Sequence, residues 1–176
     1  MKITSHSLRA FFGIAVATVS AIFVISSLKA NPAHEHANSA RAYQTPAVDS
    51  AQHQAVLSPV QQMFDGMSKR DAAAIKKPVL SGGVMVLMRD GKPTRMTFEE
   101  FADRVGKPGT TKIEERIHDP LVRIDNDLAM VWAPFEFLVD GKVDHCGTDL
   151  FNLVRVDGQW IIASVADTGR KDCGPR

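Results

Sequence analysis

Three apolar runs rich in β-branched and aromatic residues fill positions 128–168, and two Asp-Gly pairs separate them. Asp140-Gly141 and Asp157-Gly158 each lie between runs of this kind. Asp-Gly in that setting is a strong hairpin signal, because both central residues of a type I′ turn need φ > 0. The pattern therefore predicts a three-strand antiparallel meander around which the rest of the chain is arranged.

The two turns also predict a register for the meander. With two-residue loops, Glu136 lies opposite His145, Trp132 opposite Asp149, and Phe151 opposite Ser164. One face then carries Met130, Trp132, Glu136, His145, Asp149, Phe151, Leu153, Trp160, Ile162 and Ser164. Both faces are largely apolar, so each needs a cover. We expect helices to cover one face, and a second subunit is one candidate for covering the other. A one-residue bulge would swap the faces beyond it.

Helical spacing of apolar residues precedes the meander. Positions 51–68 carry an apolar stripe that includes Val56, Val60 and Met63, which predicts a first helix. Asp71 can cap a short second helix. A third helix is expected over 98–105, and a Thr97/Glu100 capping box marks its start.

Short strands complete the set of predicted elements. We expect a turn at 81–83, a small hairpin over 84–96 around Asp90-Gly91, and a long strand over 112–124 that Pro120 interrupts. Helices and strands are segregated along the chain, so the class is α+β. The expected sheet has four long antiparallel strands plus the small hairpin, and the three helices precede the long strands.

The N-terminus differs in kind from this domain. Lys2 and Arg9 flank a polar start, and positions 10–28 carry no charge. This layout predicts either a cleaved secretory signal or a retained membrane anchor, and both place the folded part outside the cytoplasm, in the periplasm or secreted. We divide the chain into a signal or anchor over 1–30, a flexible linker over 31–50, a domain over 51–173 and a tail over 174–176.

Charge and cysteine content narrow the function classes. The chain has 21 Lys and Arg against 20 Asp and Glu with no basic block, so we expect no nucleic-acid partner. Two cysteines in an exported chain favour a Cys146–Cys173 disulfide, while a buried thiol beside a tail thiol stays open. We expect no metal or cofactor, because His145 and Cys146 point to opposite strand faces and Gly82-Gly83 lacks phosphate-loop spacing.

Several segments resemble one known superfamily. They are 127–132, 140–142, 145–151, 157–162 and 167–170, together with Cys173. The pattern resembles the nuclear-transport-factor-2-like superfamily, a cystatin-like cone fold with ketosteroid-isomerase-like and polyketide-cyclase-like (SnoaL-like) members, and is closest to its lumazine-binding branch. The resemblance covers about 51–173. It implies a curled sheet wrapped by three helices around a cone-shaped pocket, and homodimers through the outer sheet face.

The predicted register suggests which residues could do chemistry. If the Trp132 face lines the cone, Asp149 lies in apolar surroundings that raise a carboxyl pKa and suit a general base. His145 or, after a bulge at Pro120, His118 would assist it. The expected ligand pocket consists of Trp132, Glu136, Phe151, Met130 and Trp160. A structural Glu136–His145 ion pair is the competing interpretation.

Two functions remain. The first is an exported, non-catalytic module whose cone binds a small apolar molecule, or which acts as a dimeric interaction domain. The second is an isomerase, dehydratase or hydrolase that uses Asp149 with His145 or His118. The only tyrosine, Tyr43, lies in the linker, which counts against a close isomerase analogue. We favour the non-catalytic module, because the proposed acid and base residues come together only in the assumed register.

Overall fold

A computed structural model describes residues 49–174. The helices are α1 (Ser50–Lys69), α2 (Ala72–Lys76) and α3 (Phe98–Val105). The strands are β1 (Val79–Arg89), β2 (Lys92–Thr97), β3 (Ile113–Ile117), β4 (Leu121–Asp125), β5 (Leu128–Val139), β6 (Lys142–Val156) and β7 (Gln159–Arg170). The predicted signal or anchor, and all but the end of the predicted linker, lie outside the described residues.

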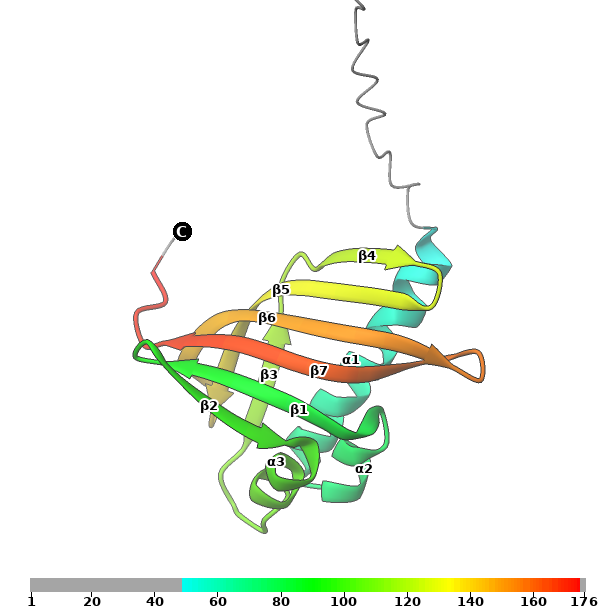
Figure 1. Ribbon diagram of the computed structural model, residues 1–176. Helices are drawn as coiled ribbons and strands as arrows, with labels where there is room; N and C mark the ends of the chain where they lie inside the picture. Colours follow the sequence, from blue (N-terminus) through cyan, green and yellow to red (C-terminus); the bar gives the residue numbers. More distant parts are fainter. Residues whose placement is uncertain (1–48, 175–176) are drawn as a thin grey trace, which may run out of the picture. The chain divides into compact units, whose positions relative to one another are not determined.

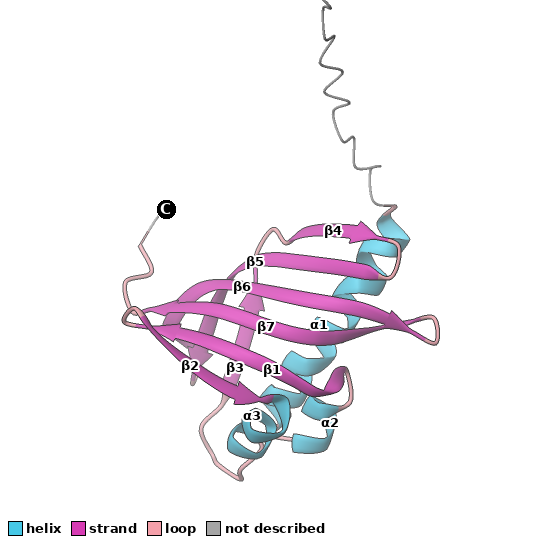
Figure 2. Ribbon diagram, viewed as in Figure 1, coloured by secondary structure: helices cyan, strands magenta, loops and turns pink. Residues whose placement is uncertain are grey.

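The strands form one curled sheet in the order β2-β1-β7-β6-β5-β3, and β4 also pairs with β5 (Figure 1). The predicted α+β class and curled sheet are confirmed. The sheet is mixed rather than wholly antiparallel, because β1 runs parallel to β7. This pairing joins the small hairpin to the end of the meander. Figure 2 shows the helices gathered on one side of the sheet.

The helix boundaries follow the capping residues that the sequence offers. Asp49 accepts a hydrogen bond from the Ala51 N–H at the start of α1, and the Asp71 carboxylate does the same for α2. At α3, the Thr97 hydroxyl accepts from the Glu100 N–H at 3.1 Å, and the Glu100 carboxylate accepts from the Thr97 N–H at 2.8 Å. The predicted capping box is therefore confirmed.

The turns follow the Asp-Gly signals. Asp140 and Gly141 have φ values of 49° and 78°, and the Asp157-Gly158 pair has 49° and 77°, as type I′ turns require. The turn predicted at 81–83 is wrong. Those residues lie inside β1, where the pairing with β7 shifts between Val79 and Val84. Gly83 permits the close approach of β1 to α3, since a Cβ there would stand 2.6 Å from the Phe98 ring. Gly82 instead has a φ of 77°, a conformation that favours glycine.

A one-residue bulge corrects the predicted register between β5 and β6. Leu138 pairs with Val143 but Phe137 pairs with His145, so Asp144 is the extra residue. Glu136 consequently faces Cys146 and not His145. Trp132 likewise faces Leu150 and not Asp149. The predicted pairs Glu136–His145 and Trp132–Asp149 are therefore wrong.

A second irregularity lies between β6 and β7. Asn152 pairs with Ser164 while Leu153 pairs with Ile162, which leaves Ala163 as the extra residue. The predicted Leu153–Ile162 pair is confirmed, whereas the predicted Phe151–Ser164 pair is wrong. Because of the two bulges, the residues predicted to share the Trp132 face lie on different faces of the sheet, which is the effect expected of a one-residue bulge.

The inner face of the sheet holds the core. Val131, Phe151, Leu153 and Ile162 are buried there together with the α1 stripe. The outer face is more open: Trp132 is 48% exposed, and its cross-strand neighbour Leu121 is 43% exposed. Across residues 49–174, no helix combines the length and apolar character that crossing a bilayer needs.

Candidate functional site

A cavity of about 180 Å³ lies between the inner face of the sheet and the helices. Its wall is mainly aromatic and sulfur-containing, from Met63, Phe64, Met67, Met85, Phe101, Phe135, Phe137 and Phe151. Its polar side chains are Arg89, Glu115, His145, Asp149 and Asp167. An apolar cleft with a few convergent polar groups is the usual form of a small-molecule site.

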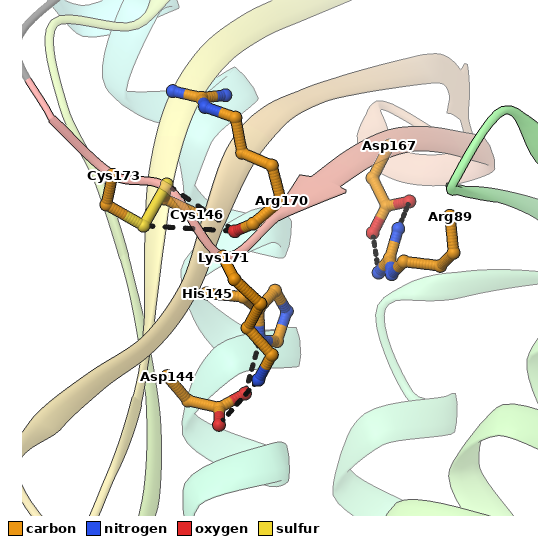
Figure 3. Close-up of polar contacts among 8 residues, drawn as sticks. All are labelled: Arg89, Asp144, His145, Cys146, Asp167, Arg170, Lys171 and Cys173. Atoms are coloured by element: carbon orange, nitrogen blue, oxygen red, sulfur yellow. Dashed lines mark hydrogen bonds and ion pairs between the residues drawn. A yellow bond between two sulfur atoms is a disulfide. The ribbon is translucent and has the colours of Figure 1, made fainter.

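Arg89 and Asp167, which both line the cavity, form an ion pair (Figure 3). Arg89 Nη1 and Nη2 donate to the two oxygens of Asp167 at 2.6 and 2.7 Å. The Asp167 hydrogen bond and charge raise the pKa of Arg89 above its ordinary value. Gly169 makes room for this geometry, since a Cβ there would stand 2.6 Å from Arg89 Nε.

Besides Asp167, the cavity wall holds two further carboxyl groups, those of Asp149 and Glu115. Asp149 is only 2% exposed, and its Oδ2 accepts no hydrogen bond from any side chain or backbone group within residues 49–174. Burial, followed by the charge and hydrogen bond of Glu115, raises the pKa of Asp149 well above its ordinary value. Burial also raises the pKa of Glu115 to about 7. Two carboxyl groups can share a hydrogen bond only when one holds a proton, so this pair retains a proton near neutral pH.

His145 closes another part of the cavity wall. Its ring stacks on Phe137 at a centroid distance of 4.8 Å and meets Phe135 edge-on at 5.8 Å. Its Nδ1 lies 2.9 Å from Asp144 Oδ2, and Lys171 Nζ donates to Asp144 Oδ1 at 2.9 Å (Figure 3). Lys171, and then His145, lower the pKa of Asp144. The bulge residue Asp144 therefore orients the His145 ring.

The predicted disulfide is present. Cys146 of β6 is bonded to Cys173, with 5.8 Å between their Cα atoms. Cys146 pairs with Arg170 in the sheet, so the chain needs only a short return after β7 to reach it. The bond fastens the segment after β7 to β6 beside Lys171 (Figure 3).

The structure brings together only part of the predicted site. Asp149, His145 and Phe151 line the cavity, and their roles there remain predictions. His118 does not: its Nε2 lies 3.4 Å from Glu136 Oε2, with both side chains more than one third exposed. Glu136 therefore has a histidine neighbour on the surface, as the competing interpretation proposed, but the neighbour is His118 and not His145.

Three other expected pocket residues, Trp132, Met130 and Trp160, lie elsewhere. Trp132 is half-exposed on the outer face, and Met130 shares that face because it lies two residues away on β5. Trp160 packs beneath the Arg155 guanidinium, 4.5 Å from the ring centroid. None of the three lines the cavity. The bulge at Asp144 is the physical reason, because it moves Asp149 inward and leaves Trp132 outside.

Sequence reasoning missed three cavity residues: Arg89, Glu115 and Asp167. Glu115 did carry a signal, because it shares a strand face with Ile113 and Ile117. An acidic residue on an apolar strand face is unusual enough to mark a pocket. Arg89 and Asp167 carried no comparable signal, since the parallel β1–β7 pairing that joins them is a long-range contact. Among the described residues, no group of three or more His, Cys, Asp or Glu is placed to hold a metal ion.

Comparison with known proteins identifies the fold and family. Residues 51–166, more than half of the chain, match the model of the family described as "Putative lumazine-binding". A search of curated proteins finds no match at the threshold used. The chain is similar to a solved nuclear-transport-factor-2-like protein of unknown function from Pseudomonas putida, with 13% identity and a TM-score of 0.60 over 73% of this chain and 100% of that one.

Two further solved structures agree. One is a nuclear-transport-factor-2-like protein of unknown function from Shewanella baltica, with 18% identity and a TM-score of 0.55 over 70% of this chain and 98% of that one. The other is a domain of unknown function with a cystatin-like fold from Nostoc punctiforme, with 16% identity and a TM-score of 0.53 over 68% and 78%. The chain therefore belongs to the family described as "Putative lumazine-binding", and it shares the fold of these nuclear-transport-factor-2-like and cystatin-like structures.

Proposed function

We propose that the domain is an exported, non-catalytic module that binds a small, mostly apolar molecule in its cavity. The observation that carries the proposal is Asp149, a buried carboxyl whose Oδ2 accepts no hydrogen bond within residues 49–174. Buried polar atoms nearly always have a hydrogen-bond partner, so a buried oxygen that accepts no hydrogen bond beside an apolar cavity favours a bound donor. The family description, which names binding and no reaction, supports the same proposal.

The size of the cavity limits the ligand. An apolar cavity of about 150 Å³ accommodates benzene, and pockets for drug-sized ligands begin at about 300 Å³. The volume of about 180 Å³ therefore suits one ring with a short substituent. Lumazine, which the family description names, has two fused rings. We accordingly propose a one-ring ligand class and do not carry lumazine over to this chain.

Export is part of the proposal. The Cys146–Cys173 disulfide favours an oxidising compartment, such as the periplasm or the exterior of the cell. The uncharged run over 10–28 is the expected export signal or, uncleaved, a membrane anchor. Both alternatives place the cavity outside the cytoplasm.

We also propose a homodimer through the outer sheet face. Trp132 and Leu121 are cross-strand neighbours there, and Leu128 at 57% exposure extends the apolar surface along β5. Exposed apolar groups of this kind mark protein interfaces. A twofold interface would place the same surface against itself.

Native mass spectrometry of the full chain, expressed with its own N-terminus and purified oxidised without refolding, tests these statements together. We expect a dimer, each chain two hydrogens lighter because of the disulfide, with a co-purified small molecule. Asp149→Asn should reduce the fraction of ligand-bound protein, while Glu114→Gln, an exposed change on the same strand as Glu115, should leave it unchanged. A protein that is always empty and binds no one-ring compound would contradict ligand binding.

A second function is favoured by one observation, the raised pKa values of Asp149 and Glu115. A pair that keeps a proton near neutral pH could supply a general acid and a general base to an isomerase, dehydratase or hydrolase. His145 could assist from the same wall, whereas His118 lies outside the cavity. If this function holds, Asp149→Asn abolishes conversion of the co-purified molecule and leaves the fold intact. If binding alone holds, only affinity or stability changes.

A further inference from the structure

The charged groups that face the cavity come from four strands. Arg89 of β1, Glu115 of β3, His145 and Asp149 of β6, and Asp167 of β7 are the titratable side chains of its wall. The contributions of α1, α3 and β5 to the wall are apolar: Met63, Phe64, Met67, Phe101, Val105, Phe135 and Phe137. Charge complementarity to a ligand therefore depends on these five side chains.

Arg89 does not neutralise the Glu115–Asp149 pair. Both oxygens of Asp167 accept hydrogen bonds from it, at 2.6 and 2.7 Å, so its charge is already balanced by a carboxylate. His145 is tied at Nδ1 to Asp144, which Lys171 also holds. The pair carries one negative charge while it shares a proton and two when it loses that proton. Above about pH 7, where Glu115 has lost its own proton, the charge of the empty cavity is thus negative.

The remaining wall also favours positive charge. Phe64, Phe101, Phe135, Phe137 and Phe151 present aromatic rings to the cavity. Aromatic rings attract organic cations through their negative faces, and more strongly where water is excluded. A neutral ligand would leave the negative pair unbalanced, and an anion would add a like charge in apolar surroundings. Of the three charge classes, only a cation satisfies both the carboxyl pair and the aromatic wall.

We propose that the cavity takes an organic cation of about one ring, an amidinium, guanidinium or ammonium whose N–H groups replace the proton shared by Glu115 and Asp149. The proposal rests on the proposed binding function and names the class of its ligand. In the step, the ligand enters with one positive charge, the pair releases its single proton to solvent, and two carboxylates accept the ligand's N–H groups. One proton leaves for each cation bound.

This exchange makes binding depend on pH. Below the range in which the pair loses its proton, the cation must displace a tightly held proton, so affinity is lower. As the pH rises through that range, the cost disappears and affinity rises. The pKa of Glu115, about 7, marks the loss of the first of the pair's two protons. The shared proton leaves at higher pH, because the pKa of Asp149 lies well above its ordinary value. The Arg89–Asp167 pair keeps both charges across this range, because its hydrogen bonds favour the charged forms.

Three compounds of nearly the same shape separate charge from shape: benzamidine as a cation, benzamide as a neutral donor and benzoate as an anion. Binding of each to the full oxidised protein is measured by titration calorimetry at about pH 5.5, about pH 7 and about pH 8.5. Benzamidine stays protonated throughout. We expect it to bind at least about tenfold more tightly than benzamide at the highest pH, and benzoate not to bind. Its affinity should rise about tenfold per pH unit between about pH 7 and about pH 8.5, and more steeply below about pH 7, where Glu115 also holds a proton. Buffers of different ionisation enthalpy should report about one proton released at about pH 8.5.

Matched variants assign the effect to the carboxyl pair. Glu115→Gln and Asp149→Asn should each reduce the preference for benzamidine over benzamide to about threefold or less and remove most of the pH dependence. Glu114→Gln, 48% exposed and paired with Arg116, should change neither. Thermal unfolding shows that each variant is folded before it is titrated.

The results distinguish this inference from the proposed function. If benzamide binds wild-type protein as tightly as benzamidine, or if no proton is released, the cationic class is wrong while ligand binding stands. If none of the three compounds binds the folded wild-type protein at any pH, the cavity is not a one-ring binding site, and both proposals fail.

Discussion

Asp149 and Asp167 are cross-strand partners in the β6–β7 pairing, yet the fold treats their carboxyl groups in opposite ways. Asp167 accepts two short hydrogen bonds from Arg89. Asp149 is more deeply buried, and its Oδ2 accepts none within the described part of the chain. Like charges placed directly opposite each other destabilise a sheet, so the protein needs a means of neutralising this pair.

The two solutions differ in what they leave for a ligand. The charge of Asp167 is balanced by a side chain of the same domain, so its requirement is met in the empty protein. Asp149 is balanced by a proton shared with Glu115, and a proton can be exchanged for another donor. The comparison indicates that Asp167 stabilises the cavity wall while Asp149 remains available for binding.

Removing Arg89 should give the largest effect on this comparison. Arg89→Met leaves Asp167, only 10% exposed, without its cation and opposite Asp149. Removing one partner of a buried pair costs at least about 3 kcal/mol, and the 38% exposure of the Arg89 side chain places this pair at the lower end. We expect the free energy of unfolding, measured by urea denaturation at neutral pH, to fall by about that amount.

Two further variants show whether the loss comes from an unpaired charge. The double variant Arg89→Met with Asp167→Asn should recover about half of the loss, because no buried charge is then left unpaired. Arg116→Met removes an exposed bidentate pair with Glu114 and should cost less than about 1 kcal/mol. Equal costs for Arg89→Met and Arg116→Met would mean that burial of the Asp167 pair adds nothing.

The pH dependence of stability should distinguish the proton-sharing pair. Glu115 has a pKa of about 7 in the folded protein against an ordinary value of 4.5, so between these values the folded state binds more protons than the unfolded state. Stability is therefore fully present below about pH 4.5 and is lost as the pH rises to about 7. We expect a contribution of roughly 3 kcal/mol. It is measured as the difference between wild type and Glu115→Gln in urea denaturation across this range. Glu114→Gln should retain the wild-type slope, and a slope of opposite sign would show that Glu115 is not buried as described.

Much of this architecture could be predicted from local sequence signals. The three Asp-Gly turns, the capping box before α3 and the interruption at Pro120 each depend on a few neighbouring residues, and each is found where expected. The disulfide was predicted from the compartment and the cysteine count. Such features are set by backbone conformation and local hydrogen bonds, which a single sequence displays.

The cavity was less accessible, because one residue decides which side chains enter it. The bulge at Asp144 has no sequence signal as strong as Asp-Gly. It shifts the partners of Glu136 and Trp132 by one residue, to Cys146 and Leu150, and so exchanges the faces of β6 relative to β5. The Arg89–Asp167 pair depends on the parallel β1–β7 contact between segments far apart in the chain. Local patterns therefore predicted the strands, while long-range pairing determines the site.

Asp167→Asn should have a smaller effect than loss of Arg89. The variant keeps a hydrogen-bond acceptor for Arg89 and removes the charge opposite Asp149, so the lost ion pair is partly offset. We expect a destabilisation of about 1 kcal/mol in urea denaturation at neutral pH. A cost as large as that of Arg89→Met would show that repulsion between the two aspartates contributes little.

Asp149→Asn should have the smallest effect of the series at neutral pH. The side chain that it replaces already holds a proton there and donates to Glu115, and the Asn amide offers an N–H donor of similar shape. We expect a change in the free energy of unfolding below about 1 kcal/mol at pH 7. At alkaline pH the variant should be the more stable protein, because wild type must then ionise a buried carboxyl and the amide has no charge to bury. Denaturation curves at both pH values would show this crossing. A large loss of stability at pH 7 would instead mean that Asp149 supports the fold as Asp167 does, and that its carboxyl is not available for a ligand.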